Sequence, residues 1–287
     1  MKEAQQYILK ELSGIYPQPE LQSVARLLLS HITGFDFTGL LLNKNTTFSD
    51  NQRSVLKNYV ELLRSGMPVQ YVTGETEFYG LRFRVGPEVL IPRPETEELV
   101  EWAVKLAPAG ARLMDIGTGS GCIAIAIKHS RPDCYVYACD ISAGALGLAR
   151  KNAEINGVEV NFFQCDIVND QLPETGFDLL VSNPPYIPAD EAGQMESRVK
   201  DFEPAIALFV DTSDPLLFYR TIARKSVGRL LPGGNLLFEI HRSYADECMN
   251  VLANEGFTDC ELRKDISGND RMIRAAKDLV SERIKLF

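Results

Sequence analysis

The residues whose types and spacing best suit chemistry stand at positions 183–186, where Asn-Pro-Pro-Tyr follows the apolar run 179–181. The side-chain carbonyl of Asn183 and the backbone carbonyl of Pro184 are two acceptors that can hold both hydrogens of a planar NH2 group. The two prolines fix φ and carry no N–H donor, so they form a stiff turn. Tyr186 adds an aromatic face on which a flat group can stack. The pattern therefore predicts a clamp for an amide or a ring amino group.

Such a clamp has a chemical purpose, because the lone pair of an amide or ring amino nitrogen is delocalised and the nitrogen is a poor nucleophile. Two acceptors that hold both hydrogens orient the group and favour a more pyramidal nitrogen. We therefore predict that Asn183, Pro184 and Tyr186 are catalytic, and that these three bind substrate together with Pro185. The alternative is an ordinary loop, since Asn-Pro and Pro-Pro are common turn signals. A glycine-rich stretch upstream favours the clamp.

That stretch, Asp-Ile-Gly-Thr-Gly-Ser-Gly at 115–121, closes one predicted strand and opens a predicted helix. Glycines let a backbone approach a ligand closely, and ligands of open α/β sheets bind beyond the carboxyl ends of the strands. The Gly-x-Gly-x-Gly spacing differs from that of dinucleotide-binding loops, and no Gly-Lys-Ser/Thr follows as in a nucleotide P-loop. The stretch therefore favours a nucleoside without phosphates. The residues predicted to bind it here are Gly117, Thr118, Gly119, Ser120 and Gly121.

Acidic residues follow the next two predicted strands. Asp140 ends the second strand, where a carboxylate can accept both hydroxyls of a ribose. Asp166 ends the third, where an acid can meet an adenine amino group while Ile167 packs on the ring. Each acid alone could be a strand-end cap, but acids at the ends of successive strands favour one shared site, which suits a sulfonium cation with an adenosine tail. Ile141 and Asn183 complete the predicted cofactor-binding set.

Composition and charge limit the class of protein. The 287 residues are 45% hydrophobic and 24% charged, which is typical of a globular protein. No apolar run approaches the roughly 18 residues that cross a membrane, and residues 1–6 are too polar for a secretory signal. We therefore expect a cytoplasmic protein without a membrane partner. The net charge of −9 argues against broad nucleic-acid binding, which rests on clustered Lys and Arg.

The cysteines and histidines indicate no metal or redox site. No two cysteines form a Cys-x-x-Cys pair, and most stand in apolar stretches where a thiol behaves as a small hydrophobe. The histidines are scattered, and none has a second histidine or a cysteine four residues further on. We expect no bound metal. These residues are Cys122, Cys134, Cys139, Cys165, Cys248 and Cys260, with His31, His129 and His241.

The chain begins with a region, 1–70, whose periodicity predicts a small helical bundle. One apolar stripe follows the prolines at 17 and 19, and a second follows Ser49 and Gln52, which fit a capping box. The stripe residues are Leu21, Val24, Ala25, Leu27 and Leu28, then Val55, Leu56, Tyr59, Leu62 and Leu63. Between 71 and 90 the period changes to two with glycine punctuation, which predicts a β-hairpin linker.

The remainder, 91–287, alternates strand and helix patterns. This order predicts an α/β fold whose parallel sheet has helices on both faces. Seven strands are expected at 111–116, 134–139, 160–165, 177–181, 235–240, 260–263 and 271–275. Helices are expected at 119–129, 142–155, 215–230 and 243–255, and Gly233 with Gly234 marks a turn before the fifth strand.

Four motifs together resemble class I S-adenosylmethionine-dependent methyltransferases, and more closely the PrmC/HemK family. They read Ile-Pro-Arg-Pro-Glu-Thr-Glu at 91–97, Asp-Ile-Gly-Thr-Gly-Ser-Gly at 115–121, Asn-Pro-Pro-Tyr-Ile at 183–187 and Lys-Asp-Ile-Ser-Gly-Asn-Asp-Arg at 264–271. The resemblance covers nearly the whole chain. Two stretches depart from it: 209–216 reads Phe-Val-Asp-Thr-Ser-Asp-Pro-Leu where the family often has a Gly-Gly-x-Asp-Gly-Leu stretch, and His241 and Tyr244 stand where it often has Gly and Gln.

The resemblance implies an enzyme with a protein substrate. Members of the PrmC/HemK family transfer the methyl group of S-adenosyl-L-methionine to the side-chain amide nitrogen of the glutamine in the Gly-Gly-Gln motif of peptide chain release factors. The product is S-adenosyl-L-homocysteine. For this chain the resemblance implies a Rossmann-like methyltransferase domain at 91–287 and a helical domain at 1–70. Because one glutamine side chain is too small to identify a protein and residues 1–70 carry no catalytic signature, our hypothesis is that this helical domain docks the release factor. We expect it to act as a monomer.

Two other functions fit parts of the sequence. An Asn-Pro-Pro-Tyr clamp also binds the exocyclic amino group of a flipped base, as in methyltransferases that act on N6 of adenine or N4 of cytosine in nucleic acids. The acidic charge and the helical N-terminal region count against that alternative. A binding module that keeps the cofactor fold without catalysis is a second alternative, which the intact clamp disfavours.

Overall fold

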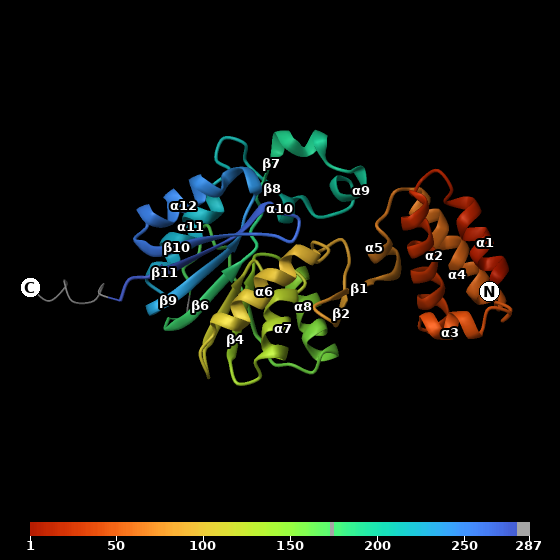
Figure 1. The fold of residues 1–287 in the computed structure, drawn as a ribbon, viewed down its shortest axis with the longest axis horizontal. Helices are drawn as coiled ribbons and strands as arrows, with labels where there is room; N and C mark the ends of the chain where they lie inside the picture. The colour runs from red at the N-terminus through yellow and green to blue at the C-terminus, as the bar shows by residue number, and fades with distance from the viewer. Residues whose placement is uncertain (173–174, 280–287) are drawn as a thin grey trace, which may run out of the picture. The chain divides into compact units, whose positions relative to one another are not determined.

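The computed structural model describes residues 1–172 and 175–279, and Figure 1 shows them as a ribbon. The described residues form two compact units. The first contains Met1–Glu75 together with Glu196–Phe202, and the second contains the rest. The sequence patterns gave no sign that 196–202 would join the N-terminal helices.

The first unit is helical. Its elements are α1 (Lys2–Glu11), α2 (Gln18–Thr33), α3 (Phe37–Leu42), α4 (Asp50–Arg64) and α5 (Val69–Thr73). The capping box of α4 is present. The backbone N–H of Gln52 donates to the Ser49 hydroxyl at 3.2 Å, and the backbone N–H of Ser49 donates to the side-chain carbonyl of Gln52 at 3.0 Å. The predicted stripes form one core, except that Leu27 is 51% exposed and the half-buried Val55 is not part of that core. Amphipathic stripes thus bury one face of each helix, as helices of this length require for stability.

The separate segment of the first unit contains the short helix α9 (Ser197–Lys200). Within it, the Arg198 guanidinium lies 3.9 Å from the centre of the Tyr16 ring. It also donates to the Glu20 carboxylate at 2.9 Å and to the Ile15 carbonyl at 2.8 Å. A cation over an aromatic face and a charge-assisted hydrogen bond join this segment to the start of α2.

Two short strands, β1 (Glu75–Phe78) and β2 (Leu81–Arg84), form the hairpin. The fully buried side chain of Asn152, from α8 (Ala143–Ile155), fixes it: its carbonyl accepts from the Arg84 N–H at 2.7 Å, and its NH2 donates to the Arg84 carbonyl at 3.0 Å. The same NH2 donates to the Ser120 carbonyl at 2.9 Å. One side chain therefore ties the hairpin to the glycine-rich loop.

The second unit contains a central sheet of seven strands among the described residues, in the order β10-β11-β9-β6-β3-β4-β5. The strands are β3 (Arg112–Ile116), β4 (Tyr135–Asp140), β5 (Asn161–Gln164), β6 (Phe177–Ser182), β9 (Leu230–Glu239), β10 (Phe257–Lys264) and β11 (Asp270–Lys277). The five strands from β9 to β5 pair in parallel, and β11 is antiparallel to both its neighbours. The predicted seven-stranded α/β fold is confirmed.

Helices cover both faces of this sheet (Figure 1). On one face lie α6 (Pro94–Leu106), α7 (Cys122–Ser130) and α8, and on the other lie α11 (Leu217–Val227) and α12 (Ala245–Asn254). Successive residues of a strand point to opposite faces, so Leu113 enters the first core and Met114 the second. Strand β3 is therefore buried on both sides, as an apolar run in a parallel sheet predicts.

The predicted turn at Gly233 and Gly234 is wrong, because both residues lie inside β9. The strand begins five residues earlier than expected, and its register against β6 shifts between Phe177 and Leu179. Gly233 takes a φ of 78°, and a Cβ on Gly234 would come within 2.9 Å of the Leu231 carbonyl oxygen. The glycines thus mark an irregularity within a strand. The helix expected at 215–230 ends at Val227, because strand β9 already begins at Leu230.

The stretch after β6 carries several short elements that the periodicity did not predict. They are β7 (Ile187–Pro188), η1 (Ala189–Gln194), α10 (Ala205–Leu208) and β8 (Phe209–Val210), and η2 (Arg242–Tyr244) follows β9. Strands β7 and β8 pair in parallel as a separate two-stranded sheet. The stretch 209–216, which departs from the family pattern, therefore begins on β8, and β8 pairs with β7 directly after the clamp.

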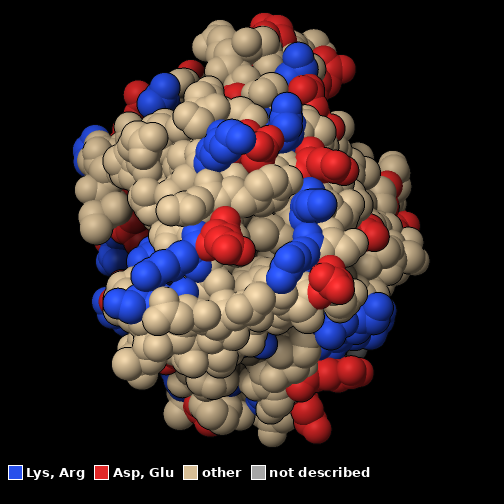
Figure 2. Space-filling view, turned by 90° about the vertical axis from the view of Figure 1, so that its right-hand side faces the viewer, with Lys and Arg blue, Asp and Glu red and all other residues tan. Residues whose placement is uncertain are grey.

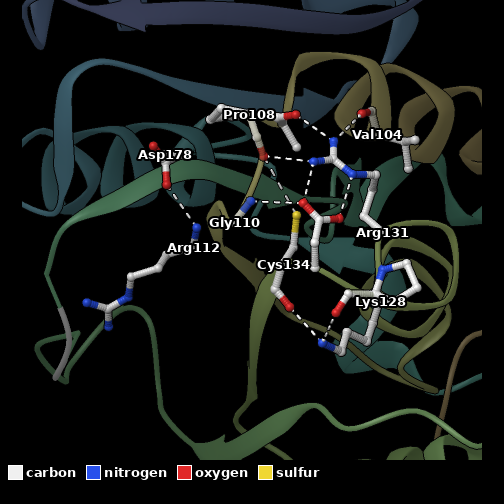
Figure 3. Close-up of polar contacts among 11 residues, drawn as sticks. Val104, Pro108, Gly110, Arg112, Lys128, Arg131, Cys134 and Asp178 are labelled. Atoms are coloured by element: carbon white, nitrogen blue, oxygen red, sulfur yellow. Dashed lines mark hydrogen bonds and ion pairs between the residues drawn. The ribbon is translucent and has the colours of Figure 1, made fainter.

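A polar cluster fixes the amino ends of β3 and β4 (Figure 3). Arg131 donates to the Ala107 carbonyl at 2.6 Å and to the Pro108 carbonyl at 2.8 Å, and it pairs with Asp133 at 2.8 Å. The hydrogen bond from Arg131 holds the pKa of Asp133 well below its usual range, and the Gly110 N–H donates to the same carboxylate. This cluster is structural, since ligands of such sheets bind at the opposite, carboxyl ends.

We predict that Asn152→Leu lowers the free energy of unfolding of the second unit by about 2 to 4 kcal/mol. The change keeps the branched outline of the side chain but leaves backbone groups of Arg84 and Ser120 without partners, and each such group costs roughly 1 to 3 kcal/mol where it is buried. Trp102 is the only tryptophan and is buried on α6, so its fluorescence during urea unfolding reports on this unit. The exposed neighbour Lys151, changed to Ala, is the matched control. Equal midpoints for the two variants would contradict the prediction.

Candidate active site

A cleft of about 370 Å³ opens at the carboxyl edge of the central sheet. Its walls come from the segments that follow four successive parallel strands, at 116–120, 139–142, 165–169 and 182–185. The stretch 88–93, Thr96 and apolar side chains at 206–207, 218 and 222 complete it. Strand β3 pairs with β4 on one side and β6 on the other, so the chain order reverses here. Open α/β sheets bind ligands at such a switch point, and the volume suits a small molecule.

The glycine-rich loop forms one wall of the cleft. Gly117 and Gly119 have φ values of 76° and 53°, and a Cβ on either would meet nothing within 4 Å, so their backbone faces open space. At Gly121 the constraint is packing, because a Cβ there would come within 2.9 Å of Ile125 and 3.1 Å of Ala149. The glycines thus serve two purposes: two hold the loop open, and the third brings α7 against α8.

Two buried polar atoms of this loop have no hydrogen-bond partner within the described protein: Asp115 Oδ1 and Ser120 Oγ. The other oxygen of Asp115 accepts from the Thr118 hydroxyl at 2.6 Å. Burial raises the pKa of the Asp115 carboxyl to about 7, although the Thr118 hydrogen bond works in the opposite direction. A buried carboxyl with a free oxygen, beside a cleft, would be stabilised in its charged form by a cationic ligand.

Asp140 lies at the end of β4 with its carboxylate against the same loop. One oxygen accepts from the Gly119 N–H at 2.8 Å and the other from the Ser142 N–H at 2.9 Å. Burial raises its pKa, while the backbone hydrogen bonds oppose that shift. A carboxylate has about four lone-pair sites. Two therefore stay available for the ribose hydroxyls that the sequence predicts as its ligands, and Ile141 follows it on the cleft wall.

Asp166 and Ile167 also line the cleft, two residues beyond the end of β5. The carboxylate accepts from the Val168 N–H at 2.8 Å and from the Asn169 side chain at 2.7 Å. The hydrogen bond from Asn169 lowers its pKa, so the residue is ionised at neutral pH. Its predicted role as the acceptor for an adenine amino group stays a prediction, since three hydrogen bonds from its own loop already occupy most of the acceptor sites of the carboxylate.

Asn183, Pro184 and Pro185 line the cleft directly after β6. The Ser182 hydroxyl donates to the Ile116 carbonyl at 2.6 Å, which fastens the end of β6 to the end of β3. The clamp and the glycine-rich loop, which are more than 60 residues apart in sequence, are thereby placed on facing walls of one cleft. The structure brings together the predicted cofactor residues and these three clamp residues.

Tyr186 has a different environment from its three neighbours, because it is not among the residues that line the cleft. Its hydroxyl donates to Glu239 Oε1 at 3.3 Å, and its ring centre lies 5.9 Å from that of His241. Burial raises the pKa of this phenol, so it remains protonated and acts as a hydrogen-bond donor. Stacking of a substrate amide on Tyr186 stays a prediction.

The sequence patterns missed two polar residues behind the clamp, Thr96 and Glu239. The Thr96 hydroxyl donates to Glu239 Oε2 at 2.7 Å, and its oxygen accepts from Asn183 Nδ2 at 3.3 Å. Both residues are buried, with exposed fractions of 3% and 1%. Thr96 stands in the motif at 91–97 that resembles the family, and the sequence alone indicated only that it would lie in the first turn of a helix. Glu239 ends an apolar strand, and a lone acid at that position carries no local signal.

A salt bridge positions the stretch before α6. Arg93 pairs with the buried carboxylate of Glu203 at 2.6 Å, and the Ile91 N–H donates to the other oxygen of Glu203 at 3.1 Å. This pair fixes Pro92 and Arg93 on the cleft wall and sets the first turn of α6, which carries Thr96. The Pro-Arg-Pro sequence therefore shapes the site rather than only starting a helix.

The chain is similar to known proteins over nearly its whole length. Residues 3–74 match the PrmC N-terminal domain, and residues 96–199 match the methyltransferase small domain. A release factor glutamine methyltransferase from Bacteroides thetaiotaomicron is 43% identical over 270 residues, which are 94% of this chain and 97% of the relative. One from Flavobacterium psychrophilum is 38% identical, over 93% of this chain and 95% of the relative. This chain belongs to the release factor glutamine methyltransferase family.

A solved methyltransferase structure from Pyrococcus furiosus has the same fold. It is 18% identical with a TM-score of 0.52, and the match covers 80% of this chain and 100% of that one. Family membership and the methyltransferase domain make this chain a class I S-adenosyl-L-methionine-dependent methyltransferase. The expected fold, enzyme class and cofactor are thereby confirmed.

The cleft of this family member fits S-adenosyl-L-methionine, a cation with an adenosine tail. Asp115 does not line the cleft, but its buried carboxyl directly precedes the lining residue Ile116 and places a negative charge beside the cleft; the open backbone at Gly117 and Gly119 leaves space for a ligand without phosphate groups. Asp140 and Asp166 would hold the nucleoside from the next two strands. No group of three potential metal ligands occurs among residues 1–172 and 175–279. In the same part of the chain no helix is long and apolar enough to cross a membrane.

We predict that affinity for S-adenosyl-L-methionine rises as pH increases from about 5.5 to 7 and then levels off. Below pH 7 the ligand-free enzyme holds Asp115 protonated, and a cationic ligand must displace that proton, so affinity is lost as pH falls by up to about tenfold per unit. Calorimetric titration across this range measures the slope. The variant Asp115→Asn should bind more weakly at pH 7 and with a flatter profile. An unchanged slope in that variant would assign the pH dependence to another group.

Proposed function

We propose that this enzyme transfers a methyl group from S-adenosyl-L-methionine to the side-chain amide nitrogen of the glutamine in the Gly-Gly-Gln motif of peptide chain release factors. The observation that carries this proposal is the orientation of Asn183. Its NH2 group is engaged by Thr96, so its carbonyl is the end left for a substrate NH2 group. The named activity of the relatives in Bacteroides thetaiotaomicron and Flavobacterium psychrophilum supports the same substrate.

The residues of the chain act by positioning rather than by strong base catalysis. The Asn183 and Pro184 carbonyls accept the two amide hydrogens and align the nitrogen for in-line displacement. When bound, S-adenosyl-L-methionine supplies an electrophilic methyl group on a sulfonium. A nitrogen–carbon bond forms, the sulfur–carbon bond breaks with its electron pair left on sulfur, and the nitrogen then loses a proton to water. Orientation and preplaced dipoles of this kind account for large rate effects without a basic side chain.

Incubation of the enzyme with methyl-labelled S-adenosyl-L-methionine and purified release factors tests the proposal. We expect label on the Gly-Gly-Gln glutamine, located by mass spectrometry, and none on a factor whose motif reads Gly-Gly-Glu. DNA and RNA oligonucleotides in parallel reactions test the adenine and cytosine alternative. Label on a base and none on the factors would overturn the proposal.

We predict that Asn183→Ala reduces the single-turnover rate by roughly a hundredfold, because one of two fixed dipoles at the reacting group is removed. Its affinity for S-adenosyl-L-methionine should change by less than about threefold. Asn169→Ala is the contrasting control, since Asn169 holds Asp166 and should affect affinity more than the saturated rate. Equal losses of rate and affinity in Asn183→Ala would mean that this residue mainly holds the cofactor.

The first unit is proposed to dock the release factor, because a single glutamine side chain is too small to identify one protein. Standard interfaces bury roughly 1,200 to 2,000 Å², far more than the cleft offers. A hollow of about 390 Å³ lies in this unit between α1, α4 and the loop before α4. Its floor is apolar, with Phe48 and Leu56 buried, and its rim carries four basic side chains: Lys2, Lys44, Arg53 and Lys57. We call it the basic hollow.

The charges of the basic hollow support an acidic protein segment as its ligand. None of the ion pairs between described residues involves Lys2, Lys44, Arg53 or Lys57, and Glu3 is the one acidic residue of the lining. On the face drawn in Figure 2, Lys and Arg alternate with Asp and Glu and form no continuous basic band, as an extended nucleic-acid surface would require. A local basic site on a chain of net charge −9 suits a limited contact with a protein. Action as a cytoplasmic monomer is part of this proposal.

We predict that Lys44→Glu combined with Lys57→Glu lowers kcat/KM several-fold for a full-length release factor and leaves kcat/KM for a short Gly-Gly-Gln peptide unchanged. Charges at the edge of an interface act mainly on association, so the effect should shrink at high salt. Lys10→Glu is the matched control, since Lys10 is exposed on α1 outside the hollow. Equal loss on the peptide and the factor would place the effect in the active site instead.

A further inference from the structure

The clamp residue Asn183 is the end of a chain of three buried or half-buried polar groups. Glu239 closes β9, Thr96 lies in the first turn of α6, and Asn183 follows β6. The carboxylate of Glu239 accepts from the Thr96 hydroxyl at 2.7 Å, and the Thr96 oxygen accepts from Asn183 Nδ2 at 3.3 Å. Thr96 also lines the cleft, whereas Glu239 does not. Three elements therefore meet behind one catalytic amide.

The direction of these hydrogen bonds follows from the chemistry of the groups. An ionised carboxylate has no hydrogen to donate, so the single hydroxyl hydrogen of Thr96 points at Glu239. The lone pairs of the Thr96 oxygen then face Asn183 and can only accept. The NH2 end of the Asn183 amide satisfies that acceptor, and the carbonyl end would not. A side chain whose two ends are nearly equal in shape thus has one preferred orientation.

The consequence for the reaction concerns which end of Asn183 meets the substrate. A glutamine NH2 group presents two donors, and only a carbonyl can accept them. If the Asn183 amide were reversed, two NH2 groups would face each other, and the Thr96 oxygen would lose its donor. We propose that Glu239 and Thr96 are positioning residues that hold the carbonyl of Asn183 toward the substrate amide. This inference rests on the proposed transfer to an amide nitrogen.

Three neighbours of Glu239 favour its ionised, accepting form. Burial raises its pKa and the charge of Glu95 acts in the same direction, whereas the Thr96 hydroxyl, the positive charge of Arg271 and the Tyr186 hydroxyl oppose that shift. Arg271 is itself held by Asp265 at 3.0 Å. The second oxygen of Glu239 accepts from Tyr186 at 3.3 Å. One buried acid therefore orients the first and last residues of the Asn-Pro-Pro-Tyr sequence.

Two variants of residue 96 test the inference with a Gly-Gly-Gln peptide in single-turnover reactions. Thr96→Val keeps the shape but removes the hydroxyl, and we expect the rate to fall by roughly ten- to hundredfold, as small misplacements of reacting groups do. Thr96→Ser keeps the hydroxyl and should retain most of the rate. Affinity for S-adenosyl-L-methionine should stay within about threefold in both. A purely structural role for Thr96 would instead lower affinity and rate together.

The double variant Thr96→Val with Asn183→Ala separates positioning from any independent effect. Because Thr96 is proposed to act only through Asn183, the double variant should be no slower than Asn183→Ala alone. Losses that multiply would overturn the inference, as would a Thr96→Val enzyme as fast as the unchanged one. If Thr96→Val does not fold, as judged by Trp102 fluorescence, Glu239→Gln replaces it in the same cycle with the same expectation. Failure of the unchanged enzyme to methylate the peptide would instead refute the proposed function.

Discussion

The pairing of β3 with both β4 and β6 is the constraint on which the site depends. Strands that run parallel and in register end at one edge, so whatever follows β3, β4 and β6 must meet there. Residues 117–121 follow β3, Asp140 ends β4 and Asn183 follows β6. The Ser182 hydroxyl strengthens the arrangement by fastening the end of β6 to the Ile116 carbonyl. The glycine-rich loop, Asp140 and the Asn-Pro-Pro-Tyr segment are therefore placed by backbone pairing, and side chains only refine their positions.

The sequence predicted best those features whose causes are local. A capping box and a glycine-rich loop between a strand and a helix are each decided within a few residues, and so the cap at Ser49 and the loop at 117–121 could be recognised directly. The role of 183–186 as a clamp stays a prediction. The number of strands followed from apolar runs separated by glycines. The exposed Leu27 shows the limit of the same method. An apolar stripe indicates which face of a helix is buried, but not how much of that face the neighbouring helices cover.

What the sequence could not predict depends on contacts between distant residues. Thr96 and Glu239 are 143 positions apart, and Asn152 and Arg84 are 68 apart. Neither pair has a local pattern, since a buried polar residue looks like any other polar residue until its partner is known. The prediction of a turn at Gly233 and Gly234 was wrong for a related reason. Glycine marks both turns and strand irregularities, and only the pairing of β9 with β6 distinguishes the two. Polar groups that tune a site are therefore the least visible in sequence.

The composition of the first unit also bears on how the chain is made. Its helices from Met1 to Glu75 leave the ribosome long before Glu196–Phe202, yet that later segment belongs to the same compact unit through Arg198. Synthesis proceeds at roughly 5 to 20 residues per second, so the interval between the two pieces lasts several seconds or more. During that time the ring of Tyr16 and the carboxylate of Glu20 lack their contacts with the Arg198 guanidinium. The last element of the first unit is thus completed only after four of the seven strands of the central sheet have been synthesised.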